Sequence, residues 1–221
     1  MSNFCYEWPR PGLTSDIVLF AYKENHLKTL LIQRRDDPFK GMWAFPGGFV
    51  EESENAYQGA LRELEEETHL KDIELKSLFF DSQLNRDPRG WTVSEVYYGF
   101  LPYGETFEKA GDDAAKTQWF NLNDLPDFAF DHDFIINKAI EKVKELILFK
   151  TFGFEILPLQ FDIIHLMQVY LTILKDNNLV KKIIKKLIEL DVVLLVDSEK
   201  SLFRFNKSKV DIIQDKGFLL A

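Results

Sequence analysis

The sequence predicts an α/β fold, with a mixed sheet in residues 1–150 and a mainly helical arrangement in residues 151–221. Short runs rich in Val, Ile, Phe, Tyr and Trp alternate with turn residues in the first part, which is typical of strands. Two stretches there, 54–68 and 133–149, have apolar residues at helical spacing. Strands with helices packed on the sheet give an α/β arrangement. The change of pattern near residue 150 predicts two domains.

The strands of the first domain are separated by clear turn signals. Residues 16–22 and 27–33 are predicted to form a hairpin that turns at Glu24-Asn25. Further strands are expected at 75–80, 91–101 and 118–120. The helix over 133–149 closes the domain, and Asp131-His132 is interpreted as its N-cap.

The most informative stretch is 48–70. Ser53 is a suitable N-cap, so a helix is predicted over 54–68. One side of this helix carries three carboxylates at i, i+3 and i+4: Glu63, Glu66 and Glu67. Like charges at such spacings cost about 0.2–0.5 kcal/mol per pair. Hard oxygen ligands beside a Gly-Gly turn suit Mg²⁺ bridging a pyrophosphate, whereas the alternative is a solvated acidic face.

The spacing of this stretch resembles the Nudix box, the signature of the Nudix hydrolase family. Gly48, Glu54, Arg62-Glu63 and Glu66-Glu67 all fall at box positions. One position departs, because the family has Gly two residues after the Glu pair and this chain has His69. Since glycine caps a helix in the left-handed conformation, His69 is expected to loosen the helix end without removing a metal ligand.

Flanking segments are similar to the branch that contains ADP-ribose pyrophosphatases and the Nudix-related transcriptional regulators of NAD metabolism. They are 38–50, 86–89 and 128–132, and the resemblance covers 10–150. It implies the Nudix α/β/α sandwich. It also implies hydrolysis of a nucleoside diphosphate linked to another moiety, with ADP-ribose giving AMP and ribose 5-phosphate. Spacing does not reveal which diphosphate the pocket selects.

The resemblance also implies roles for individual residues. The implied cofactor is Mg²⁺, or Mn²⁺ in its place, with these ligands: the Gly47 carbonyl, Glu63, Glu66 and Glu67. Arg62 and Glu54 look like the family's orienting pair, and they join the three glutamates in the catalytic set. The candidate substrate-binding residues are Gly48, Arg86 and Arg89. Planar guanidinium groups suit phosphate oxygens, although both arginines can equally be solvated loop charges.

The second domain, 151–221, has the element order of a winged helix-turn-helix. A helix over 161–174, capped by Asp162, ends at 176–178, and a basic helix over 179–190 and a hairpin follow. This order resembles the C-terminal domain of the Nudix-related regulators. On that reading four lysines meet DNA phosphates: Lys181, Lys182, Lys185 and Lys186. The alternatives are the wet side of an ordinary helix and a winged fold that serves for dimerisation.

Charge separates the two domains. Residues 1–150 hold 17 Lys and Arg against 27 Asp and Glu, whereas residues 151–221 hold 10 against 9. The acidic domain repels nucleic acid unless a metal or a basic patch intervenes. The Nudix-related regulators carry two adjacent arginines in the corresponding basic helix, and this chain has Val180-Lys181 at those positions. Lysine reads bases less well than arginine does.

Two functions from different classes remain open. Intact box glutamates favour an enzyme, whereas the winged domain favours a ligand-responsive transcriptional regulator that senses ADP-ribose or a sugar without turnover. Double-stranded DNA as a partner implies a homodimer on a palindromic site. The single cysteine, Cys5, excludes an internal disulfide. No signal peptide or membrane-length apolar run is visible, so a soluble, cytoplasmic protein without a membrane partner is expected.

Overall fold

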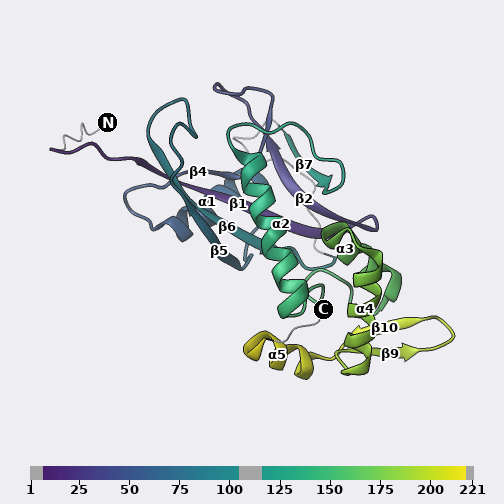
Figure 1. The fold of residues 1–221 in the computed structure, drawn as a ribbon. Coiled ribbons are helices and arrows are strands. Elements are labelled where there is room, and N and C mark those ends of the chain that lie inside the picture. The colour runs from purple at the N-terminus through teal and green to yellow at the C-terminus, as the bar shows by residue number, and fades with distance from the viewer. Residues whose placement is uncertain (1–6, 105–115, 218–221) are drawn as a thin grey trace.

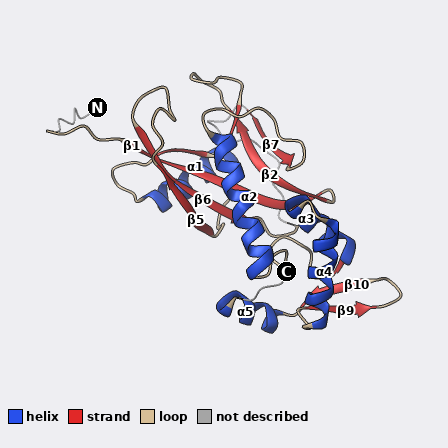
Figure 2. Ribbon diagram, viewed as in Figure 1, coloured by secondary structure: helices blue, strands red, loops and turns tan. Residues whose placement is uncertain are grey.

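The computed structural model describes residues 7–104 and 116–217 (Figures 1 and 2), so Cys5 lies outside the described part. A mixed sheet of seven strands has the order β3-β2-β1-β6-β5, with β4 paired to β1 and β7 to β2. The strands are β1 (Gly12–Lys23), β2 (His26–Gln33), β3 (Trp43–Ala44), β4 (Gly47–Phe49), β5 (Leu75–Asp81), β6 (Thr92–Phe100) and β7 (Lys116–Asn121). Of the described helices, none is long and apolar enough to cross a membrane.

Helices cover both faces of this sheet (Figure 1): α1 (Ala56–Thr68) on one face and α2 (His132–Phe149) on the other. Successive side chains of a strand point to opposite faces, and both faces of β1 are buried. Ile17 and Leu19 pack in one cluster with Leu64 of α1. Phe20 packs in the other with Val143 of α2. The predicted α/β/α sandwich is therefore confirmed.

The predicted hairpin is also confirmed, since β1 and β2 pair antiparallel on either side of the Glu24-Asn25 turn. Both turn residues have positive φ, 51° and 61°, which matches the twist of a two-residue hairpin. Sequence analysis missed β3 and β4, which are only two and three residues long. These two short strands lie on either side of Phe45-Pro46, and β4 contains Gly47 and Gly48.

The start of α1 differs from the prediction. Asn55 is the N-cap in place of Ser53: its side chain accepts a hydrogen bond from the Gln58 N–H, and the Gln58 side chain accepts one from the Asn55 N–H. These two hydrogen bonds form a capping box, which fixes Asn55 as the N-cap, so the helix begins at Ala56. Glu54 therefore lies in the preceding loop, where its carboxylate accepts the Glu51 N–H at 2.9 Å.

The end of α1 shows how the chain manages without the box glycine. His69 itself adopts the left-handed conformation, with φ of 59°, and its N–H donates to the Glu65 carbonyl at 2.8 Å. The last turn of α1 therefore keeps its backbone hydrogen bond, and the expected loosening of the helix end is not seen there. What remains is the conformational cost of a side chain at positive φ.

We expect His69→Gly to raise the free energy of unfolding by about 0.5–1 kcal/mol, because glycine takes this conformation without a Cβ clash. Urea denaturation measures the change. The matched control is Glu65→Gly, one turn earlier on the same helix, which should lower stability by about 1 kcal/mol. A loss of stability in both variants would show that His69 carries no conformational strain.

The C-terminal part contains the elements that the sequence predicted, in the predicted order, with two additions. A second sheet has the strand order β8-β10-β9. Its elements are β8 (Phe161–Asp162), α3 (Ile163–Leu174), α4 (Asn177–Glu189), β9 (Val193–Asp197), β10 (Leu202–Phe205) and α5 (Lys207–Lys216). The Asp162 side chain caps α3 as predicted, and the Asp176 side chain caps α4. Sequence analysis missed β8 and α5.

One apolar core runs through both parts of the chain, across the predicted boundary at residue 150. Phe152 is fully buried and contacts the Phe100 ring of the main sheet, with the ring centroids 5.2 Å apart. The Tyr170 hydroxyl of α3 donates to the Phe152 carbonyl at 2.8 Å. The Tyr22 ring of β1 lies 5.5 Å from the His165 ring of α3. The C-terminal elements are therefore packed onto the sheet and not merely tethered to it.

Candidate active site

The glutamates of α1 lie against the glycine turn, residues 45–48, which comprises the β3–β4 connection and the first two residues of β4. The Gly47 N–H donates to a Glu67 carboxylate oxygen at 2.9 Å. A Cβ atom at Gly48 would lie 2.2 Å from a Glu63 carboxylate oxygen, so any side chain there would displace the Glu63 carboxylate. Gly47 has φ of 154°, and a Cβ there would lie 2.1 Å from the Ser15 carbonyl oxygen. Gly47 is therefore required for the close approach to β1, whereas Gly48 leaves the space that the Glu63 carboxylate occupies.

Arg62 gathers three of the carboxylates. Its guanidinium donates to Glu54 at 2.7 Å, to Glu63 at 2.9 Å and to Glu66 at 3.1 Å. The expected salt bridge between Arg62 and Glu54 is thus present. These hydrogen bonds raise the pKa of Arg62 and lower the pKa of Glu54. The Arg62 guanidinium therefore fixes Glu63 and Glu66, two of the predicted metal ligands.

The acidic groups fit a divalent metal by their chemistry. Burial raises the pKa of Glu67 to about 8, and burial also raises the pKa of Glu63. Among the described residues, no three His, Cys, Asp or Glu side chains already stand in an arrangement that could hold a metal ion. Arg62 and the Gly47 N–H occupy the carboxylate oxygens instead. The donors are hard oxygens, as Mg²⁺ prefers, and Arg62 contacts one carboxylate oxygen of Glu63 and one of Glu66.

A small cavity of about 40 Å³ lies beside this turn, and three arginines line it: Arg34, Arg86 and Arg89. Arg34 and Arg89 lie over the Phe130 ring, 4.7 Å and 5.5 Å from its centroid. Arg89 also binds Asp87 through two parallel hydrogen bonds. Burial and the nearby charge of Arg89 lower the pKa of Arg34. Sequence analysis missed Arg34, whose signal was an arginine placed directly after a buried strand.

Arg86 also lines the cavity, but its charge is already engaged. Its side chain is only 6% exposed, so the solvated alternative is wrong for this residue. The guanidinium lies 3.2 Å from Asp16, 3.0 Å from Asp131 and 3.6 Å from Asp81. Asp131 occupies the N-cap position of α2, yet its side chain makes no capping hydrogen bond and binds Arg86 instead. The interpretation of Asp131 as the N-cap is therefore confirmed for its position, but its side chain binds Arg86 and makes no capping hydrogen bond.

The predicted DNA-contact lysines lie on α4 in two settings. Lys181, Lys182 and Lys185 are exposed, and Lys186 is partly buried. The Lys185 ammonium lies 3.6 Å from a Glu189 carboxylate oxygen. Two of the four, Lys181 and Lys185, border an apolar groove of about 470 Å³ whose other lining residues include Met167, Ile184, Ile188 and Phe203. The exposed face of α4 is therefore basic with an apolar flank.

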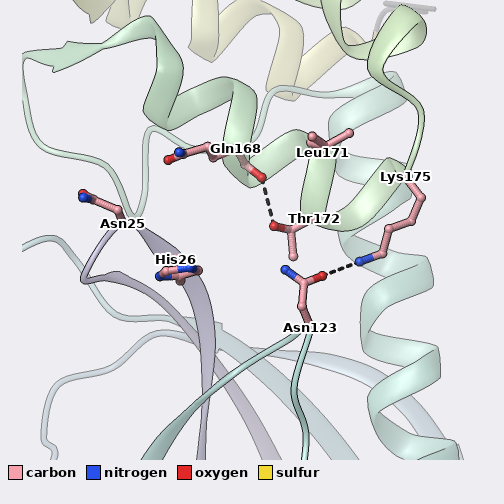
Figure 3. Close-up of a pocket in the computed structure, with 7 residues that line it drawn as sticks. All are labelled: Asn25, His26, Asn123, Gln168, Leu171, Thr172 and Lys175. Carbon is pink, nitrogen blue, oxygen red and sulfur yellow. Dashed lines mark hydrogen bonds between the residues drawn. The ribbon is translucent and has the colours of Figure 1, made fainter.

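A polar groove of about 440 Å³ separates the β1–β2 turn from α3 (Figure 3). Lys175, the residue that follows α3, donates to the Asn123 side chain at 2.5 Å. Of the predicted site residues that the structure describes, none lines this groove. The predicted glycines and arginines gather instead around the smaller cavity, beside the α1 glutamates, which is the candidate active site.

Comparison with known proteins agrees with this geometry. The NUDIX domain model matches residues 12–141. The chain is 29% identical to the ADPR responsive transcriptional repressor NtrR of Acinetobacter baylyi over 198 residues, 88% of this chain and 79% of that protein. It is 46% identical to the ADP-ribose pyrophosphatase of Methanocaldococcus jannaschii over 113 residues, 51% of this chain and 66% of that protein.

Solved structures give the same picture. Shewanella oneidensis NrtR complexed with a 27mer DNA is similar with a TM-score of 0.69 and 26% identity, over 90% of this chain and 95% of that one. The NUDIX domain of that protein, complexed with ADP ribose, is similar with a TM-score of 0.58 and 34% identity, over 62% and 90% of the two chains. With the box glutamates, the glycine turn and the matched family model in agreement, the chain belongs to the Nudix hydrolase family.

Proposed function

We propose that this protein is a Mg²⁺-dependent diphosphatase that hydrolyses ADP-ribose, or a closely related nucleoside diphosphate, to AMP and ribose 5-phosphate. The observation that carries the proposal is the contact of Glu63 and Glu67 with the Gly47-Gly48 turn, next to a cavity flanked by cations. Similarity to an ADP-ribose pyrophosphatase supports the substrate class.

The chain's own residues divide the work. Arg34 and Arg89 hold phosphate oxygens, since planar guanidinium groups match them in shape and charge. Arg62 orients Glu63 and Glu66. A carboxylate of the α1 set accepts a proton from the attacking water. Held by the α1 glutamates and the Gly47 carbonyl, Mg²⁺ supplies positive charge against the diphosphate and lowers the pKa of bound water.

The test of this proposal is hydrolysis of ADP-ribose and a panel of related diphosphates, with and without Mg²⁺, followed by chromatography of the products. AMP that forms only with metal supports the proposal. Parallel assays with Glu66→Gln show whether the α1 carboxylates are responsible. Binding of ADP-ribose without any AMP would favour the sensor instead.

We also propose that the C-terminal part binds duplex DNA through α4, as a homodimer on a palindromic site. Two observations favour this second function. The similarity to a transcriptional repressor covers 88% of the chain, so it includes this part. The core around Phe152 is continuous from the sheet to α3, which in turn packs on α4, so a change at the nucleotide site has a packed route to the DNA-binding helix.

Charge reversal on α4 tests the DNA proposal. We expect Lys182→Glu with Lys185→Glu to weaken binding to a mixed-sequence duplex by tenfold or more at 100 mM salt, because phosphate contacts are lost and repulsion is added. Because the homodimer carries the two substitutions in each subunit, the slope of log affinity against log salt should fall by about four. The control is Lys138→Glu with Lys142→Glu on α2, the same charge change far along the chain. Equal weakening by both pairs would remove α4 from the account.

A further inference from the structure

His132, the first residue of α2, is a buried histidine beside the candidate active site with no part in the metal or substrate set. It is 3% exposed. Its ring stacks on Phe45, with centroids 5.4 Å apart and planes 17° apart, and it contacts Phe130 at 5.6 Å. Phe45 is the first residue of the 45–48 turn and lies two residues before Gly47. Burial of a polar ring costs free energy unless its nitrogens find partners, so these partners indicate what the ring does.

The two ring nitrogens bind two different segments. The Phe45 N–H donates to Nδ1 of His132 at 2.8 Å, so Nδ1 carries no proton in this arrangement. The neutral ring therefore carries its proton on Nε2. That atom lies 3.5 Å from a carboxylate oxygen of Asp16 on β1. Burial lowers the pKa of His132, which favours this neutral form. The imidazole thus bridges the backbone of the turn and the adjacent strand.

Asp16 is itself fixed on several sides. The Ser94 hydroxyl donates to its other carboxylate oxygen at 2.7 Å, and Arg86 binds the same oxygen at 3.2 Å. Asp16 pairs with Gly47 across β1 and β4. A Cβ atom at Gly47 would lie 3.1 Å from the Asp16 oxygen that faces His132. The glycine is therefore held between Asp16 on one side and Glu67, which accepts its N–H, on the other.

We propose that His132 and Asp16 are positioning residues that hold residues 45–48 in the conformation that places Gly47 and Gly48 against the α1 glutamates. The inference rests on the proposed function only for its effect on turnover, since the contacts themselves are independent of it. Displacement of the turn by an ångström would move the Gly47 carbonyl and the Glu67 carboxylate apart. Small misplacements of this kind cost large factors in rate and in metal affinity.

Two substitutions separate positioning from simple packing, because each amide imitates one ring nitrogen. His132→Asn offers an oxygen near the place of Nδ1 and can still accept the Phe45 N–H. His132→Gln offers an NH₂ group near the place of Nε2 and leaves the Phe45 N–H without its acceptor. His165→Gln is the control, because it removes a partly buried histidine of α3 that has no contact with the turn.

The experiment measures hydrogen exchange of a peptide covering residues 43–50, Mn²⁺ affinity by electron paramagnetic resonance, and kcat and KM for ADP-ribose. For His132→Gln we expect exchange at Phe45 at least tenfold faster, Mn²⁺ affinity and kcat each 10–100-fold lower, and KM within threefold of wild type. His132→Asn should recover most of each change, and His165→Gln should show none.

These measurements decide whether His132 positions residues 45–48. Wild-type exchange at residues 43–50 in His132→Gln would overturn the proposal, as would equal losses in the Gln and Asn variants. Unchanged kcat in a His132→Gln protein whose wild type turns over would also overturn it. If the wild type releases no AMP, the proposed function fails, yet selective loosening of the turn and weaker Mn²⁺ binding in His132→Gln would still support positioning.

Discussion

Glu67→Gln is expected to lower turnover by a factor on the order of 10³ without unfolding the protein. The amide oxygen of Gln can still accept the Gly47 N–H, so the turn keeps its hydrogen bond. What disappears is a negative charge in the proposed metal-binding set. The rate of AMP release from ADP-ribose at saturating Mg²⁺ measures the effect. Glu65→Gln is the matched control, since Glu65 is exposed, pairs with Lys71 and should leave turnover unchanged.

The same substitution carries a pH-dependent prediction for the metal-free protein. Burial raises the pKa of Glu67 to about 8 from an ordinary value of 4.5. Between these values the folded state holds the proton more tightly than the unfolded state, so stability falls as pH rises. Glu67→Gln removes that fall and should be more stable than wild type at pH 8 by about 1–3 kcal/mol. Parallel stability curves from pH 5 to 8 would contradict this assignment of the buried charge.

Phe152→Ala is expected to lower the free energy of unfolding by about 3–5 kcal/mol, the usual cost of a cavity in place of a buried phenyl ring. Phe152 is fully buried and joins the main sheet to α3, so both parts of the chain should unfold in one transition. All four tryptophans lie in residues 1–150, so their fluorescence reports the first part. Hydrogen exchange in α4 reports the second.

The control for Phe152 is Leu159→Ala, in the same connecting segment but 93% exposed, which should change stability by less than about 0.5 kcal/mol. Two separate transitions in the wild type, one for each probe, would show that the core does not couple the halves. Such a result would also remove the packed route between the nucleotide site and the DNA-binding helix.

The elements that follow from local chemistry were predictable. The hairpin at Glu24-Asn25, the cap at Asp162 and the glutamate face of α1 each depend on residues close together in sequence. Family spacing added roles for Gly48 and Glu63, but that the two residues lie against each other appears only in the structure. The first residue of α1 was harder to predict, because Ser53 and Asn55 are both suitable N-caps. Only the reciprocal hydrogen bonds between Asn55 and Gln58 decide between them.

The parts that escaped prediction depend on distant contacts. The burial of Arg86 could not be predicted, because nothing in the sequence shows that three aspartates from separate parts of the fold surround this loop residue. Arg34 and His132 gain their importance from Phe130 and Phe45, which reach them only in the folded chain. A charged residue at the start of an otherwise apolar strand, as at Asp16, was the one local sign of the buried network.

The most direct test of the central claim is hydrolysis of ADP-ribose in ¹⁸O-labelled water with Mg²⁺, with mass spectrometry of the products. We predict AMP and ribose 5-phosphate in equal amounts, with one labelled oxygen on a phosphate of one product, and a rate lower by a factor on the order of 10³ in Glu67→Gln. Recovery of unlabelled ADP-ribose from the wild type, with ligand bound but intact, would contradict the account and make the Nudix domain a sensor.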